Sequence, residues 1–319
     1  YIKDVNVTKS EDKICKIVQA GSYYSHVGKL EIEVLDGKTT INYTSNKLDL
    51  EDETDPMIDA ILESMVEEIE SLYGPVYSEE IAVATDTFEE ICEDLTTPGY
   101  KDTHVANLIC DAFKEFGGTD LGITASGFTA NPIYKGPIVG ADIYRAIGYG
   151  FNAENTLGYK LVKFGIKGSD IIIGLSFGMP FIQFTDDYII QCSDNMRYKY
   201  TATDGPDGYP IGVLDWVIIN GEPIDPDKIY TVTANLGIAL FLVQIGIMPI
   251  DLTYFDNNVT EYMVVYDYVK KKKTITPPIK RRINDVETDK QLHYSLNTKA
   301  FPNPANATTS LEFNVENED

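Results

Sequence analysis

The chain has 319 residues, of which 43% are hydrophobic, and it carries a formal net charge of −24 with an isoelectric point near 4.4. A chain of this size and composition buries a large core and folds into one to three domains. The acidic surface repels phosphate backbones and anionic lipids, which argues against nucleic acids and membrane surfaces as partners. No apolar run reaches the roughly 18 residues that a membrane-spanning helix needs.

The N-terminal part of the chain shows the alternation of β-strands. Strand-like stretches fill residues 13–50, and Asp36-Gly37 between two of them is typical of a hairpin turn. We therefore expect a β-rich segment at this end.

A helix is predicted immediately after these strands. Asp55 is its expected N-cap, Pro56 suits its first turn and Gly74 ends it. The apolar residues recur at helical spacing, at Ile58, Ile61, Leu62, Met65, Ile69 and Leu72. We expect this helix to connect two strand-rich regions.

A second helix and a loop with few polar groups follow. Residues 103–118 predict a helix that Gly117-Gly118 ends. Its predicted buried residues are Val105, Leu108, Ile109, Ala112 and Phe113. Residues 123–139 predict a buried strand, a loop that contains Gly127, and a second short extended piece. The loop has the form of a binding loop but carries few groups that could bind a ligand.

The rest of the chain mixes short helices with strands, which indicates an α+β fold. Short helices are predicted at residues 140–150 and 169–178, a strand at 155–168, and strand-like pieces over 179–235, with turns at Asp204-Gly205 and Asn220-Gly221. A last helix leads into Lys270–Lys273, whose charges complement the negative end of a helix dipole.

Neither the cysteines nor the histidines are spaced as metal ligands. The cysteines are Cys15, Cys92, Cys110 and Cys192, and they contain no C-x-x-C pair, which leaves a disulfide open. The histidines are His26, His104 and His293. Asp186 and Asp187 are neighbours in a predicted strand, so they would point to opposite faces and not form an acid/base pair.

Six stretches in one order carry a resemblance to a known family. Residues 17–34 resemble the closing strands of the metallophosphatase domain of the 5′-nucleotidase / 2′,3′-cyclic phosphodiesterase family. Five later stretches resemble the C-terminal substrate-binding domain of that family: "HVANLICDAF", "GPIVGADIYRAIGYG", "NTLGYKLVKFGIKGSDI", "INGEPIDPDKIYTVTAN" and "IKRRI". The resemblance covers residues 13–284. It implies a mixed-sheet C-terminal domain, preceded by a β-rich remnant of a metallophosphatase domain and a connecting helix.

The resemblance also implies where the domains begin and end. The expected segments are metallophosphatase-like strands at 1–50, the connecting helix at 51–75, the 5′-nucleotidase C-terminal-like domain at 76–285, and a tail at 286–319. In the tail, "PNP" and the alternating "TSLEFNV" resemble the start of an immunoglobulin-like sorting domain of secreted bacterial proteins. We expect this tail strand to pair with a sheet edge, including that of a neighbouring copy, and so to support self-association.

In the family, two divalent metal ions in the N-terminal domain activate water and polarise a phosphate. Those metal motifs would precede Tyr1, so the resemblance implies that this chain holds no catalytic residue, metal site or cofactor of its own. The C-terminal domain of the family sandwiches a nucleobase between aromatic side chains and contacts the ribose and phosphate. A nucleotide or nucleoside is therefore the expected ligand, and the expected location is extracellular, at the cell surface or periplasmic.

Part of the family's ligand loop is altered in this chain. The family's Asn-Gly-Gly-Gly-Ile-Arg aligns with residues 124–129, so Thr124 replaces the Asn and Thr129 replaces the phosphate-facing Arg. Gly127 retains one of the glycines of the turn. The resemblance therefore keeps the frame of the loop and removes two of its ligand contacts.

Two further positions of the family's site can be matched. Tyr149 stands in place of the base-stacking Phe, and its ring can stack in the same way, although "FNAE" is inserted before Asn155. Asn235 is kept, but Leu236 replaces the second aromatic residue, and no acidic residue stands where the ribose-binding Asp belongs. The resemblance thus assigns Tyr149, Asn235 and Gly127 as substrate-binding residues.

Three functions remain open. The chain is the substrate-recognition portion of a secreted 5′-nucleotidase-like phosphoester hydrolase, a non-catalytic extracellular structural or self-assembling protein with a degenerate nucleotide site, or a binder for a different ligand in a remodelled cleft. A tyrosine between glycines also suits packing, and an asparagine at a strand end also suits a cap. Because fold alone does not fix function, the sequence leaves enzymatic activity undecided.

Overall fold

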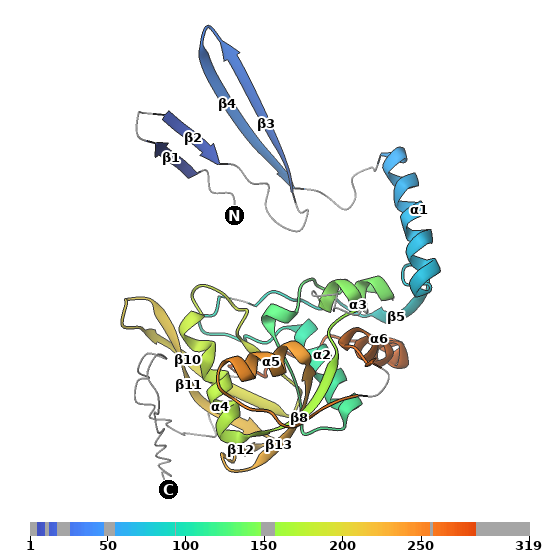
Figure 1. Ribbon diagram of the computed structural model, residues 1–319, viewed down its shortest axis with the longest axis vertical. Coiled ribbons are helices and arrows are strands. Elements are labelled where there is room, and N and C mark those ends of the chain that lie inside the picture. Colours follow the sequence, from blue (N-terminus) through green and yellow to red (C-terminus); the bar gives the residue numbers. More distant parts are fainter. Residues whose placement is uncertain are drawn as a thin grey trace. The chain divides into compact units, whose positions relative to one another are not determined.

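The computed structural model describes residues 5–9, 13–17, 26–47, 55–92, 94–147, 157–255 and 258–284, with the first two ranges described as backbone only. Figure 1 shows the elements in chain order. The chain divides into two compact units between Ile69 and Glu70, within helix α1 (Pro56–Tyr73). The predicted borders near residues 50 and 75 flank this helix, whereas the division of the structure runs through it.

The first unit consists of two antiparallel strand pairs and most of α1. Strand β1 (Val5–Lys9) pairs with β2 (Lys13–Ile17), and β3 (His26–Leu35) pairs with β4 (Lys38–Lys47). Asp36 and Gly37 join β3 to β4 with φ angles of 49° and 75°. Two consecutive residues with positive φ form the turn that suits a two-residue hairpin, so this prediction is confirmed.

Helix α1 begins and ends where its sequence predicts. The Asp55 carboxylate accepts the Met57 N–H over 2.8 Å, which satisfies one of the free donors of the first turn. Gly74 follows the helix with a φ of 83°, a conformation that a glycine adopts without strain. Among the described residues, the apolar side chains along α1 remain largely exposed: Ile58, Ile61, Leu62, Met65 and Leu72.

The centre of the second unit is a five-stranded mixed sheet. Its strand order is β14 (Ile250–Tyr254), β8 (Leu161–Lys167), β13 (Ile229–Asn235), β6 (Leu121–Ala125) and β9 (Ile190–Cys192). Strands β13 and β6 run parallel, and the other neighbours in this sheet run antiparallel. The predicted α+β class is therefore confirmed.

Two smaller sheets accompany the central one. The first contains β15 (Thr274–Ile275), β5 (Glu80–Ala84) and β7 (Gly136–Val139), and the second contains β10 (Met196–Asp204), β11 (Pro210–Ile219) and β12 (Glu222–Pro223). Asn220-Gly221 joins β11 to β12 with φ angles of 57° and 82°, which confirms the second predicted tight turn.

Five α-helices of the second unit follow α1 in the described part of the chain. They are α2 (His104–Gly117), α3 (Gly140–Ile147), α4 (Gly168–Phe177), α5 (Leu236–Gln244) and α6 (Glu261–Lys272). Thr103 caps α2 by accepting the Ala106 N–H over 3.1 Å, and the left-handed Gly118 ends it, as predicted. Helix α6 carries lysines in its last turn, where they oppose the partial negative charge of its carbonyl groups.

The second unit contains two hydrophobic clusters. One cluster includes residues of the central sheet, α4, α5 and the β10–β11 hairpin, such as Val232, Leu175 and Tyr200. The other includes residues of α2, α3, α6, β5 and β7, such as Phe113 and Val265. Because most of these side chains are fully buried, they form a closely packed base for the central sheet.

The strand prediction for residues 179–188 is wrong. Residues Met179–Phe181 form the 3₁₀ helix η2, with Pro180 in its first turn, and Phe184 donates its N–H to the Phe181 carbonyl over 2.8 Å. Only Ile190–Cys192 is a strand, so Asp186 and Asp187 lie in a turn. The predicted tail at 286–319 lies outside the described residues.

Candidate functional site

The candidate site lies along the side of the central sheet where the parallel strands β6 and β13 end. We call this side, which crosses the strand ends, the site edge. Strands β6 and β13 end side by side, and the antiparallel strands β8 and β9 begin at the same edge, because Leu161 pairs with Asn235 and Ile190 pairs with Ala125. In open α/β sheets, ligands bind outside the carboxyl ends of such strands. Ligand-binding groups are therefore expected in the loops after β6 and β13.

The loop after β6 is a single 3₁₀ turn, η1 (Ser126–Phe128). Gly127 donates its N–H to the Asp187 carbonyl over 3.1 Å, and a Cβ on Gly127 would lie 3.0 Å from Asp187 Cβ. The glycine thus allows the turn to approach residue 187 closely. Ser126 is buried, and its hydroxyl accepts the Gln191 side-chain amide over 2.9 Å.

An acidic group lies where the resemblance expects an arginine. The Thr129 hydroxyl donates to Glu90 Oε1 over 2.8 Å. Burial raises the pKa of Glu90, the Thr129 hydrogen bond partly opposes this change, and nearby Asp186 adds to the rise. This corner of the site disfavours a phosphate, because it contains the Glu90 carboxyl group, and Thr129 adds no positive charge.

The nearby cysteine does not supply a nucleophile. Burial raises the pKa of Cys92 to about 12, and its Sγ lies 3.2 Å from the Lys101 carbonyl oxygen, to which it donates. A thiol that keeps its proton at neutral pH is neither an efficient nucleophile nor a metal ligand. Cys92, Cys110 and Cys192 are all free thiols, and the last two are fully buried.

Asn235 is a fully buried cap. Its Oδ1 accepts the Ile238 N–H over 3.0 Å at the start of α5, and its Nδ2 donates to Glu261 Oε2 over 2.9 Å. Both polar atoms of the side chain are thus engaged within the protein. The structure gives Asn235 a structural role at the site edge, and contact with a ligand stays a prediction.

Glu261 joins three elements at this edge. Its Oε1 accepts the Tyr159 N–H over 2.9 Å, and its own N–H donates to the Tyr159 carbonyl over 2.9 Å. Together with the Asn235 bond, these contacts tie the entry to β8, the start of α5 and the start of α6. Burial raises the pKa of Glu261 to about 8, against the opposing effect of the hydrogen bonds from Tyr159 and Asn235.

An aromatic pair lies beside these residues. The Phe128 and Tyr159 rings are 5.9 Å apart at 71°, an edge-to-face contact. A Cβ on Gly237 would lie 2.6 Å from the Phe128 ring, so this glycine makes room for the ring. The sequence prediction missed the pair, although Phe128 directly follows Gly127 in the altered loop.

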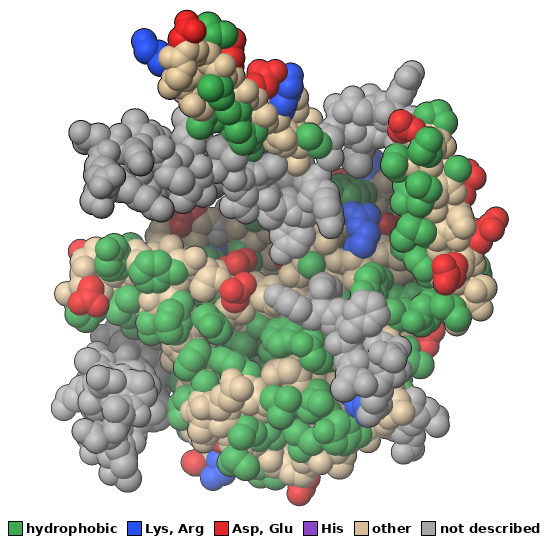
Figure 2. Space-filling view, turned by 45° about the horizontal axis from the view of Figure 1, so that its top comes forward, with side chains coloured by type: hydrophobic (Ala, Val, Ile, Leu, Met, Phe, Trp, Pro, Cys, Tyr) green, Lys and Arg blue, Asp and Glu red, His purple; other side chains and the backbone are tan. Residues whose placement is uncertain are grey.

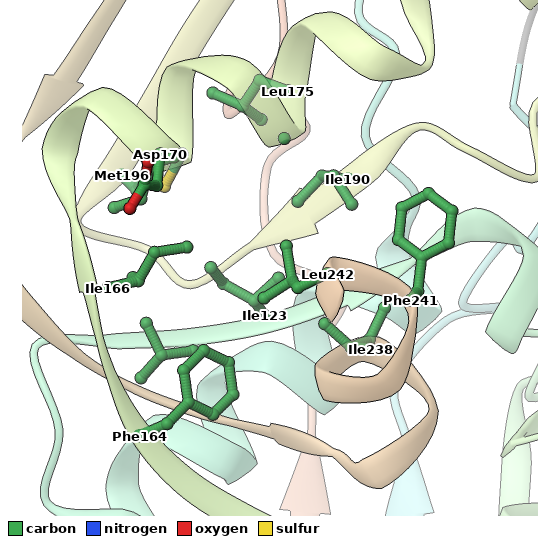
Figure 3. A pocket seen from close by; sticks show the side chains of 13 residues that line it. Ile123, Phe164, Ile166, Asp170, Leu175, Ile190, Met196, Ile238, Phe241 and Leu242 are labelled. Carbon is green, nitrogen blue, oxygen red and sulfur yellow. The ribbon is translucent and has the colours of Figure 1, made fainter. Parts of the chain in front are cut away.

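Two hollows occur in the described part of the second unit, and neither is a closed pocket of nucleotide size. Figure 3 shows a cavity of about 30 Å³ that α4, α5 and the central sheet line with apolar side chains such as Phe164, Leu175 and Leu242. This volume is no larger than that of one or two water molecules, so it is too small for a nucleoside. An open depression of about 440 Å³ is lined by Asp94, Gln183, Phe184 and Asp186 among others.

The structure brings two of the three predicted site residues to the same edge. Gly127 follows β6 and Asn235 ends β13, while Tyr149 lies outside the described residues. Ligand binding by these residues stays a prediction. Across the described ranges, no three His, Cys, Asp or Glu side chains gather in a way that could hold a metal ion. The described helices are too short or too polar to cross a membrane.

Comparisons with known proteins point to one family. Residues 81–240 match the family model described as the C-terminal domain of 5′-nucleotidase. The endonuclease YhcR of Bacillus subtilis (strain 168) is 26% identical over 226 residues, which are 69% of this chain and 16% of that protein.

Solved structures show the same fold. A 5′-nucleotidase precursor from Thermus thermophilus is similar with a TM-score of 0.67 and 20% identity, over 88% of this chain and 53% of that one. The sulfate thiohydrolase SoxB, also of Thermus thermophilus and in complex with glycerol, gives a TM-score of 0.60 and 15% identity, over 87% of this chain and 48% of that one. The chain thus spans about half of the length of these structures.

Proposed function

The chain belongs to the family of 5′-nucleotidase C-terminal domains, and from this premise we propose that it recognises the ligand for a secreted phosphoester hydrolase. The residues that hold the two divalent metal ions of this chemistry would lie outside the chain. We also propose that the protein works outside the cytoplasm, at the cell surface or in the periplasm. The similar 5′-nucleotidase is described as a precursor, which agrees with export.

The main support for this proposal is the aromatic pair Phe128 and Tyr159 at the site edge. Phe128 and Tyr159 are both partly exposed and lie beside the ends of β6 and β13, where ligands of such sheets bind. A nucleobase has a flat apolar face that stacks on or against such rings. The ligand that this edge suits best is therefore a nucleoside or a nucleotide held mainly through its base.

The groups around the pair favour recognition of the base over recognition of the phosphate. Thr129 donates its hydroxyl to Glu90, and the side-chain amide of Asn235 donates to Glu261. The Thr129 hydroxyl is thus engaged, and Asn235 is fully buried, so neither side chain presents a donor to a phosphate oxygen at the surface. We therefore expect adenosine and AMP to bind this domain with similar affinity.

Calorimetric titration of the purified chain with adenosine and with AMP tests the proposal. We expect Phe128→Ala and Tyr159→Ala each to weaken adenosine binding by about 1 to 2 kcal/mol, the size of one stacking contact. Tyr134→Ala is a matched control, because Tyr134 is exposed and its ring lies beside Arg145. Absence of binding at millimolar concentrations, or equal affinities of all variants, would overturn the proposal. Tyr149→Ala tests the predicted stacking residue in the same way.

A second candidate is a non-catalytic structural or self-assembling protein that reuses this scaffold. It is favoured by the internal engagement of Thr129 and Asn235, since both side chains bond to buried or partly buried carboxyl groups. This candidate predicts no adenosine binding and a concentration-dependent increase in mass. Sedimentation of the chain at several concentrations, together with the titration, distinguishes the two functions.

A further inference from the structure

Six aromatic side chains from neighbouring elements form two contact groups, one of four rings and one of two, which together we call the aromatic patch. Its members are Phe177 of α4, Phe181 of η2, Phe184 and Tyr188 of the following turn, Tyr209 of the β10–β11 turn, and Phe241 of α5. The Phe177 ring centre lies 5.1 Å from that of Phe241, 5.8 Å from that of Tyr188 and 5.9 Å from that of Phe181. The Phe184 and Tyr209 rings are 5.8 Å apart.

Much of the aromatic patch is open to solvent. The exposed fractions are 69% for Phe184, 56% for Tyr209 and 38% for both Phe181 and Tyr188. Single exposed rings are common on protein surfaces, but a contiguous group of them marks an interaction site. Figure 2 shows one face of the molecule, on which hydrophobic side chains form broad areas with acidic side chains among them.

The elements that build the aromatic patch contain no basic residue. The stretches 168–196, 200–227 and 229–269 include all six rings and contain no lysine or arginine. Carboxylates alternate with the rings along the chain, since Asp186 and Asp187 lie between Phe184 and Tyr188, and Asp207 precedes Tyr209. Asp187 and Asp207 are exposed. The patch therefore combines open π faces with exposed carboxylates.

We propose that the aromatic patch docks a basic amphipathic segment of a partner protein. Lysine and arginine side chains are attracted both to carboxylates and to the faces of aromatic rings, and the apolar side chains of such a segment would cover the rings. A second copy of this chain fits less well, because a twofold contact would place the same carboxylates opposite each other. Phosphate backbones and anionic lipids would meet the same repulsion.

Fluorescence anisotropy measures the docking with a labelled helical peptide that carries leucine on one face and arginine on the other. We expect the double variant Phe184→Ser, Tyr209→Ser to weaken binding about tenfold or more, as loss of central aromatic contacts does. The variant Tyr134→Ser is the control and keeps the affinity of the unmodified chain. Raising the salt concentration, or the double variant Asp187→Asn, Asp207→Asn, weakens binding as well.

A matched peptide with glutamate in place of each arginine separates charge from apolar attraction. We expect it to bind at least tenfold more weakly than the arginine peptide. Three results would overturn the proposal: equal binding of the two peptides, no effect of the patch variants, or no binding of the arginine peptide at millimolar concentration. A dimer that forms in sedimentation and is lost in Phe184→Ser, Tyr209→Ser would also overturn it, because the occupant would then be a second copy. Circular dichroism confirms that each variant is folded.

Discussion

The buried carboxyl group of Glu261 predicts how the stability of the protein depends on pH. The ordinary pKa of this group is 4.5, and burial raises it to about 8 in the folded chain. Between these two values the folded chain holds a proton that the unfolded chain releases. The free energy of unfolding therefore falls as pH rises through this window, because deprotonation is easier in the unfolded state.

The size of the effect follows from the shift. Each pH unit within the window changes the free energy of unfolding by about 1.4 kcal/mol, so the loss between pH 5 and pH 8 reaches about 4 kcal/mol. The variant Glu261→Gln removes this dependence, since an amide does not titrate. Near pH 5 it resembles the protonated acid, because each keeps one carbonyl oxygen that accepts an N–H of Tyr159 or Asn235 and carries hydrogen on its other polar atom.

Urea unfolding near pH 5, 7 and 9 measures the difference. We expect the variant and the unmodified chain to be within about 1 kcal/mol of each other near pH 5 and the variant to be more stable by a few kcal/mol near pH 9. Glu222→Gln, at an exposed position in β12, is the control and leaves the pH dependence unchanged. Parallel curves for Glu261→Gln and the unmodified chain would show that Glu261 is ionised in the folded protein at both ends of the range, and would refute the reasoning.

Two more substitutions test packing within the second unit. Arg282→Met should lower the free energy of unfolding in urea by about 3 kcal/mol, because Arg282 is buried and bonds Asp111 through two nitrogens at 2.9 and 2.7 Å. Lys280→Met breaks a more exposed ion pair and should lower it by less than about 1 kcal/mol. Gly237→Ala should displace the Phe128 ring and weaken adenosine binding about fivefold or more, while the unfolding midpoint changes little. An unchanged affinity would show that Phe128 does not contact the ligand.

Local chemistry explains which parts of the fold could be predicted from the sequence. The Asp36-Gly37 turn, the Asp55 cap of α1 and the Thr103 cap of α2 each depend on a few neighbouring residues, and each is found where the sequence indicates. The parallel pairing of β6 with β13 is different, because it joins residues such as Leu121 and Val232 that are far apart in the chain. No local signal specifies such a contact.

The wrong strand assignment has a tertiary cause. Residues 179–188 are rich in aromatic and branched side chains, which favour strands when neighbours are ignored. In the structure, Phe181 and Tyr188 instead pack against each other, 5.2 Å apart, in a turn that Pro180 begins. Contacts between rings from α4, this turn and α5 outweigh the local strand preference.

The candidate site was only partly predictable for the same reason. The resemblance located Gly127 and Asn235, whose positions follow from the order of motifs along the chain. It did not indicate Tyr159, because its contact with Phe128 is non-local, or Glu261, because a glutamate at a helix start is usually exposed. Burial of a carboxyl group depends on the packing of three elements, which a sequence pattern does not record.

The threonine that stands where the resemblance expects a phosphate-facing arginine and the neighbouring Glu90 are best understood together. An arginine at position 129 would meet the Glu90 carboxyl group that now accepts the Thr129 hydroxyl, and the pair would neutralise itself. We therefore expect Thr129→Arg alone to change the ratio of AMP to adenosine affinity less than about threefold, and Thr129→Arg with Glu90→Gln to raise it about tenfold, the effect of one charge-assisted contact. Calorimetry of the two variants and of Glu90→Gln alone measures the three ratios, and thermal unfolding checks that each variant is folded. An equal rise in both Thr129→Arg variants would show that Glu90 does not oppose a phosphate at this edge.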